Sequence, residues 1–107
     1  MNNLQLKEKP TLKEYQEYVN MLEIQRGFID QNAITKCLLL GEEMGELFKA
    51  IRKTMKLKTD VNADVSSVKE EIADILIYLC SIANRFDIDI EEAFREKEEI
   101  NKKREWI

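Results

Sequence analysis

The chain has 107 residues, of which 44% are apolar and 36% charged, and its net charge is −4. This length corresponds to one domain, and the presence of only three glycines and one proline favours helices. A negative net charge without a Lys/Arg-rich block disfavours nucleic-acid binding. No apolar stretch is long enough to cross a bilayer, so we expect a soluble, cytoplasmic protein without a membrane partner.

Residues 1–10 show no periodicity and are expected to form a flexible N-terminal tail, followed by a single domain over residues 11–107. Thr11 and Glu14 have the spacing of a capping box, in which each side chain bonds the backbone of the other. This signal predicts a first helix over about residues 12–26.

A second helix is predicted over about residues 32–55, because apolar side chains recur there at the helical period. The apolar stripe consists of Ile34, Cys37, Leu38, Met44, Leu47, Phe48, Ile51 and Met55. Gly41 and Gly45 interrupt it at a cost in helix stability, which close approach of another helix would explain.

A third helix is predicted over about residues 68–85, after a largely polar connection, with Ser67 and Glu70 as its capping box. Its segment 72–83 is apolar on nearly all sides, so it should be buried from several directions. A domain this small cannot easily surround one of its own helices. We therefore expect an oligomer with this helix near the interface.

A fourth, charged helix is predicted over about residues 90–104, with Asp89 and Glu92 as a third capping box. No convincing alternation of polar and apolar residues indicates a strand. Four helices with mostly short links predict an all-α fold, a four-helix antiparallel bundle.

Histidine is absent, which removes catalytic triads, His-ligated zinc and the Glu-x-x-His di-iron sites of helical bundles. A metal site would then use oxygen ligands, which suit magnesium or manganese. Cys37 and Cys80 both lie in apolar helical contexts and are expected to be buried free thiols.

Two acidic pairs stand out, because each pair shares a helix face at a spacing of three residues. Glu43 and Glu46 lie on the second predicted helix, and Glu71 and Asp74 on the third. In an antiparallel pair of helices the four carboxylates can converge, and Asp74 lies in an otherwise apolar run. A divalent cation would keep such a group ionised.

Neighbouring basic side chains are the alternative means of neutralising these acids. The candidates are Lys49, Arg52, Lys69 and Arg85. A solvated acidic face is a further alternative for any single glutamate.

Taken together, Glu42-Glu43-x-x-Glu46, a gap of 24 residues and Glu71-x-x-Asp74 resemble the signature of the MazG-like all-α nucleoside triphosphate pyrophosphohydrolases. The strings GEEMGELFKAIRK and EEIADILIYLC are similar to two helices of that family, in its MazG and dCTP pyrophosphatase branch. The resemblance covers roughly residues 12–105.

The resemblance implies a magnesium-dependent enzyme that cleaves non-standard or excess nucleoside triphosphates to monophosphate and pyrophosphate, with manganese as a substitute. It implies metal ligands at Glu43, Glu46, Glu71 and Asp74, and Glu42 as a group that orients or deprotonates water. It implies a homodimer or a tetramer of two dimers. Candidate substrate-binding residues are Lys97, Asn101, Arg104, Tyr78, Arg52 and Lys53.

Two alternatives stay open at this stage. One is phosphoribosyl-ATP hydrolysis, a related reaction of the same superfamily. The other is a non-catalytic helical protein that binds nucleotide or metal for regulation.

Overall fold

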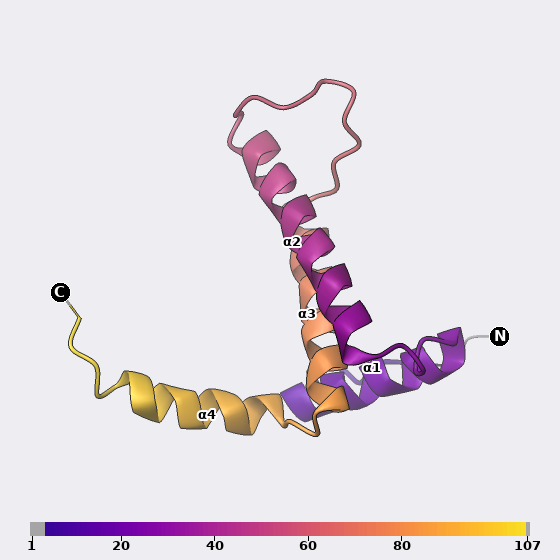
Figure 1. Ribbon diagram of the computed structural model, residues 1–107, viewed down its shortest axis with the longest axis vertical. Helices are drawn as coiled ribbons and strands as arrows, with labels where there is room; N and C mark the ends of the chain where they lie inside the picture. Colours follow the sequence, from indigo (N-terminus) through magenta and orange to yellow (C-terminus); the bar gives the residue numbers. More distant parts are fainter. Residues whose placement is uncertain (1–3, 107) are drawn as a thin grey trace.

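The computed structural model describes residues 4–106 and contains four α-helices joined by irregular segments (Figure 1). No strand occurs among these residues, which confirms the all-α fold class. The predicted helices agree with the structure to within one residue, except that the last helix ends before residue 104. The helices are α1 Leu12–Arg26, α2 Ala33–Thr54, α3 Val68–Arg85 and α4 Ile90–Asn101.

The helix ends follow the local signals in the sequence. Thr11 with Glu14, and Ser67 with Glu70, form complete capping boxes at the starts of α1 and α3. Gly27 ends α1 in the left-handed conformation with φ +78°, which glycine adopts without the steric cost of a Cβ. Local capping therefore sets these boundaries independently of tertiary packing.

The start of α4 is capped by half of the expected box. The Asp89 side chain accepts a hydrogen bond from the Glu92 backbone N–H at 3.0 Å. The return bond from the Glu92 side chain is not present among the described contacts. Asp89 alone supplies the N-cap.

The helices α2 and α3 lie side by side and antiparallel, linked by the long connection after α2 (Figure 1). The helix α1 crosses one end of this pair, and α4 packs on α1 and leads away from it. The radius of gyration is 16.6 Å, whereas a compact domain of this length has about 13 Å. Within the described residues, no helix combines the length and apolarity needed to cross a bilayer.

The buried core is small and lies where α1 meets α3. Val19, Leu22 and Cys80 form its centre, and the side chains that pack around it are Leu4, Tyr15, Tyr18, Leu76 and Ile90. Leu4 belongs to the expected tail, whose residues 1–3 lie outside the described part of the chain. The described part of that segment therefore touches the core.

Cys80 is a buried free thiol as expected, but the prediction for Cys37 is wrong, because that thiol is free and exposed. Cys37 lies on the outer face of α2, between the exposed side chains of Ile34 and Leu38. Most of the predicted apolar stripe of α2 shares this exposure, since its members Met44, Phe48, Ile51 and Met55 are also exposed. Apolar periodicity identified the helix correctly, but within one chain this stripe faces away from α3.

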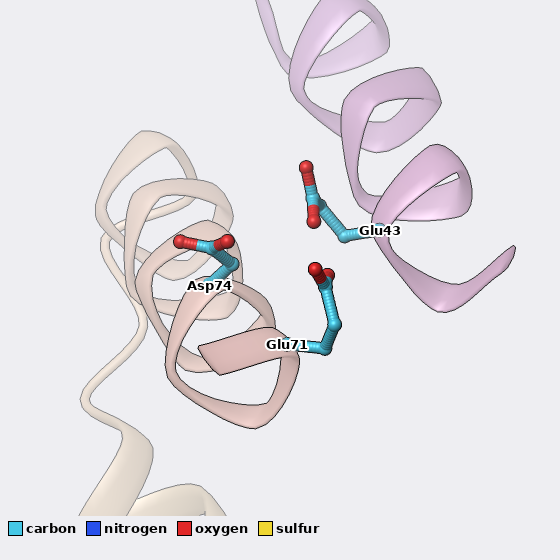
Figure 2. A group of neighbouring side chains, drawn as sticks. All are labelled: Glu43, Glu71 and Asp74. Carbon is cyan, nitrogen blue, oxygen red and sulfur yellow. The ribbon is translucent and has the colours of Figure 1, made fainter. Parts of the chain in front are cut away.

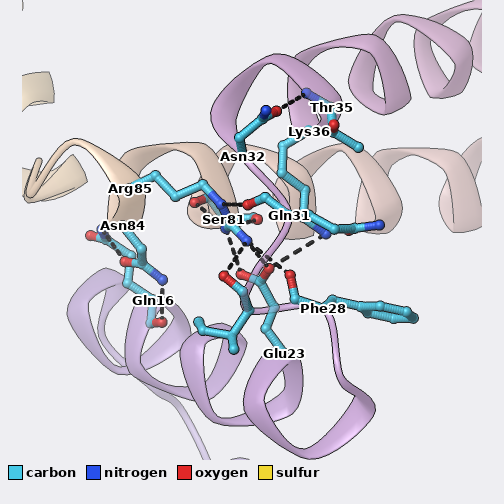
Figure 3. A network of polar contacts seen from close by, with 11 residues as sticks. Gln16, Glu23, Phe28, Gln31, Asn32, Thr35, Lys36, Ser81, Asn84 and Arg85 are labelled. Atoms are coloured by element: carbon cyan, nitrogen blue, oxygen red, sulfur yellow. Dashed lines mark hydrogen bonds and ion pairs between the residues drawn. The ribbon is translucent and has the colours of Figure 1, made fainter.

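A buried carboxylate joins α1, α2 and α3 at their junction (Figure 3). Glu23 of α1 is 2% exposed and accepts two hydrogen bonds from Arg85 of α3, at 3.0 and 2.7 Å. Lys36 of α2 lies with its Nζ 3.4 Å from the same carboxylate. The Arg85 guanidinium lowers the pKa of Glu23 against the opposing effect of burial, so the group stays ionised.

Removal of Arg85 is expected to destabilise the fold strongly, because Glu23 would keep only the more distant Lys36 as its cationic partner. For Arg85→Met we expect a loss of about 3–5 kcal/mol in the free energy of unfolding, measured by urea titration at fixed protein concentration. The matched control is Lys102→Met, which breaks the exposed Lys102–Glu99 pair and should cost under about 1 kcal/mol. Equal losses in the two variants would contradict the importance of the buried pair.

Candidate metal centre

Three carboxylates meet between α2 and α3 (Figure 2). Glu43 projects from α2, and Glu71 and Asp74 from α3, with one oxygen of each within 4.8 Å of the others. Glu71 and Asp74 lie one turn apart on the same face, and the antiparallel packing brings Glu43 opposite them. The predicted convergence is therefore present for three of the four acids.

The proximity of these acids alters their protonation. A hydrogen bond with Glu71, burial, and the charges of Glu71, Asp74 and Glu46 raise the pKa of Glu43 to about 7. Hydrogen bonds from Ser66 and Glu43 lower the pKa of Glu71. Burial, followed by the charges of Glu71 and Glu70, raises the pKa of Asp74. Without a cation, Glu43 therefore holds a proton below about pH 7 and shares it with Glu71 through a hydrogen bond.

Glu71 supplies the observation that tests whether a cation fits. Its side chain is 4% exposed, and Ser66 Oγ donates a hydrogen bond to its Oε1. Its Oε2 is buried and accepts no hydrogen bond from any described donor once Glu43 is ionised. Such an oxygen is costly in a folded protein unless another group binds it. Together with two neighbouring carboxylates, this donor set suits a hard divalent cation.

Glu46 and Glu42 lie beside the three carboxylates rather than among them. Glu46 forms an ion pair with Lys49 at 3.4 Å, although its charge contributes to the raised pKa of Glu43. Glu42 is exposed, and its charge contributes to a raised pKa of Tyr78. The roles assigned to Glu46 and Glu42 stay predictions.

Tyr78 lies one turn beyond Asp74 and lines a cavity of about 220 Å³ that Asp74 also lines. Burial, followed by the charges of Glu43, Asp74 and Glu42, raises the pKa of its phenol. The phenol is therefore neutral at physiological pH, and its assignment to substrate stays a prediction.

The predicted basic side chains are not brought to the carboxylates within one chain. Arg52 and Lys53 are exposed in the last turn of α2, about 14 Å along the helix axis from Glu43. Lys97 and Asn101 lie on α4, which packs on α1, and Arg104 lies in the exposed segment beyond α4. Their assignment to substrate stays a prediction.

The structure adds residues that periodicity did not single out. Ser66 precedes the N-cap of α3 and holds Glu71 in place. Phe28 and Lys36 line the cavity beside Asp74. Lys36 interrupts the apolar start of the α2 sequence, between Ile34 and Cys37, and that break was the available signal. The position of Ser66 depends on a folded connection and leaves no comparable trace.

A family model for the MazG nucleotide pyrophosphohydrolase domain matches residues 31–105. The chain belongs to this family. Crystal structures of C-tagged and N-tagged iMazG from Vibrio DAT 722 are each 29% identical to this MazG domain, with TM-scores of 0.65. The match covers 87% of this chain and 99% and 95% of the two iMazG chains. A search of curated proteins finds no match.

The family assignment confirms the predicted resemblance and makes this MazG domain a nucleotide pyrophosphohydrolase, an enzyme that acts on phosphorus anhydrides. Glu43, Glu71 and Asp74 all lie inside the matched segment. MazG enzymes generally depend on a divalent metal, and this cluster is compatible with one.

Without metal, the shared proton makes stability depend on pH. Because the pKa of Glu43 is raised to about 7, its contribution to stability is complete below about pH 4.5 and is lost as the pH rises through 7. In EDTA, the wild-type midpoint of thermal unfolding should therefore fall more between about pH 5 and about pH 8 than that of Glu43→Gln. An identical pH dependence of the two proteins would show that Glu43 does not retain the proton.

Proposed function

We propose that this protein is a magnesium-dependent nucleoside triphosphate pyrophosphohydrolase that removes non-standard or excess nucleoside triphosphates. The products are the nucleoside monophosphate and pyrophosphate. The observation that carries the proposal is the meeting of Glu43, Glu71 and Asp74, with Glu71 Oε2 buried and unpartnered. Manganese has the same preference for oxygen ligands and would substitute for magnesium.

Each acidic side chain has a distinct task in the proposed reaction. Glu43, Glu71 and Asp74 hold the cation, and Glu46 joins them by exchanging its ion pair with Lys49. When bound there, magnesium would supply positive charge near the phosphate oxygens and would make a water molecule more acidic. Glu42 is exposed beside the cluster and accepts the proton that this water loses. The water oxygen bonds to a phosphorus of the anhydride between the α- and β-phosphates, the bond from that phosphorus to the bridging oxygen breaks, and the monophosphate and pyrophosphate separate.

We further propose that the enzyme is a homodimer or a dimer of dimers that buries the outer face of α2. That face exposes Ile34, Leu38 and Phe48 at 72, 69 and 57%. At Gly41, on the same helix, a Cβ would meet nothing within 4 Å, so one chain does not use the space that this glycine leaves. A second copy packed closely on α2 would explain both features.

The second copy also offers a source for the missing phosphate-binding groups. Among the described residues, no lysine or arginine forms an ion pair with Glu43, Glu71 or Asp74. Lys97 and Asn101 lie on α4, which leads away from its own α2–α3 pair (Figure 1). We propose that α4 of one copy supplies these two side chains to the carboxylates of another. Arg104, Arg52 and Lys53 follow as further contacts to the outer phosphates.

Loss of single carboxylates should abolish turnover while leaving a folded oligomer. We expect Asp74→Asn and Glu46→Gln each to lower the rate of pyrophosphate release at least about 100-fold. Mutation of residues that only hydrogen-bond a metal ligand already lowers metal affinity or activity about 10–100-fold, and loss of a ligand itself should cost at least as much. Magnesium binding, measured by calorimetry, should weaken in parallel. Glu17→Gln removes an exposed acid of α1 and serves as the control that keeps activity. Near-normal activity of either variant would remove that residue from the ligand set.

The substrate class is tested by a screen of purified protein with magnesium against standard and modified nucleoside triphosphates and phosphoribosyl-ATP. We expect pyrophosphate from nucleoside triphosphates, and none after addition of EDTA. Release from phosphoribosyl-ATP alone would replace the proposed substrate. Absence of release from every compound would overturn the proposal.

Mixed oligomers test whether the active site is shared between chains. Asp74→Asn chains and Lys97→Ala/Asn101→Ala chains should each be inactive alone. Random mixing of the two in a dimer should restore about a quarter of the wild-type activity, because half of the dimers then contain one intact shared site. If both groups act within one chain, no mixed oligomer contains an intact site and activity stays absent.

A further inference from the structure

The cavity next to the carboxylates has a chemistry that the proposed reaction at phosphorus does not use. Its volume is about 220 Å³, below the roughly 300–1,000 Å³ of pockets that enclose a drug-sized ligand. It therefore suits one ring system rather than a whole nucleotide. Asp74 belongs both to this cavity and to the carboxylate cluster. This inference rests on the proposed function: the nucleoside of a triphosphate bound at the carboxylates would extend into this cavity.

Lys36 is the unusual group of the cavity. Its side chain is 4% exposed, and its Nζ lies 5.2 Å from the centre of the Phe28 ring and 5.7 Å from that of Tyr78. Burial of an ammonium group is costly unless other groups compensate for its lost hydration. The two aromatic faces provide part of this compensation.

The ion pair of Lys36 with Glu23 leaves donor capacity unused. The Nζ lies 3.4 Å from Glu23 Oε2, whereas a charge-assisted hydrogen bond measures about 2.7–2.9 Å. Arg85 takes the closer place, at 2.7 Å from the same oxygen and 3.0 Å from Oε1 (Figure 3). An ammonium group carries three donors and no acceptor. Lys36 is therefore a fixed donor at the wall of the cavity.

We propose that Lys36 reads the base of the bound nucleotide by donating a hydrogen bond to a ring carbonyl oxygen. An exocyclic amino group at that position would oppose one donor with another inside a buried site. Glu23 cannot readily offer itself instead, because Arg85 already binds both of its oxygens. Phe28 has 43% of its surface exposed and provides a face on which the base stacks. The cavity thus selects keto bases over their amino counterparts.

The test compares substrates that carry either a keto or an amino group at one ring position, with the matching change of protonation at the adjacent ring nitrogen. The pairs are dUTP with dCTP, and ITP with ATP. Wild-type kcat/KM should favour the keto member of each pair at least about tenfold, and this ratio should fall close to one in Lys36→Met. Methionine keeps the length and apolar stem of the side chain, and Glu23 keeps Arg85. Lys13→Met, an exposed lysine of α1 outside the cavity, should leave the ratio unchanged.

The outcomes separate this inference from the proposed function. Base reading by Lys36 would be overturned if the wild-type protein preferred the amino member. It would also be overturned if folded Lys36→Met lost kcat/KM equally on both members. Neither result would contradict the hydrolase activity. If Lys36→Met does not fold, the wild-type ratio still decides. If no nucleotide is hydrolysed, the proposed function fails. Calorimetric binding of dUMP and dCMP to the wild-type protein then tests the keto preference without turnover.

Discussion

The buried Glu23 carboxylate is the contact that determines how the three inner helices meet. The apolar cluster around Val19, Leu22 and Cys80 lies between α1 and α3, and α2 adds Ala50 as a buried apolar side chain. Arg85 from α3 and Lys36 from α2 both reach Glu23, and their charges are directional partners that fix the junction. The same ion triad also positions a wall of the cavity, because Lys36 both pairs with Glu23 and lines the cavity.

The carboxylate cluster has the opposite effect, because the repulsion among its acids destabilises the packing of α2 on α3. Glu43 and Glu71 raise the energy of the metal-free state through their mutual repulsion, and a shared proton relieves only part of it. A bound cation would remove the repulsion, and the buried Glu71 Oε2 would be among its ligands. Cation binding would therefore stabilise the packing of α2 on α3 through mass action, so that the proposed metal site would contribute to the stability of the fold.

Local signals in the sequence were enough to locate the helices, because Thr11, Ser67 and Gly27 act on the backbone within a few residues. The meeting of Glu43 with Asp74 followed from helical spacing and antiparallel packing. For Glu46 the sequence left two partners open, a cation and Lys49, and the structure pairs it with Lys49 at 3.4 Å. The exposure of Cys37 could not be predicted from the sequence, because the helical period identifies an apolar face but not what covers that face.

The exposed face of α2 and the outward course of α4 have a common explanation. In the proposed oligomer, a second copy would cover this apolar stripe and would supply cationic partners to the acids of the cluster. The charges would then divide by subunit: the acids that hold the cation would come from α2 and α3 of one chain, and Lys97 from α4 of another. Lys36 stands apart, since its own chain already places it at the cavity. Base reading would thus belong to the single chain, and phosphate binding to the assembly.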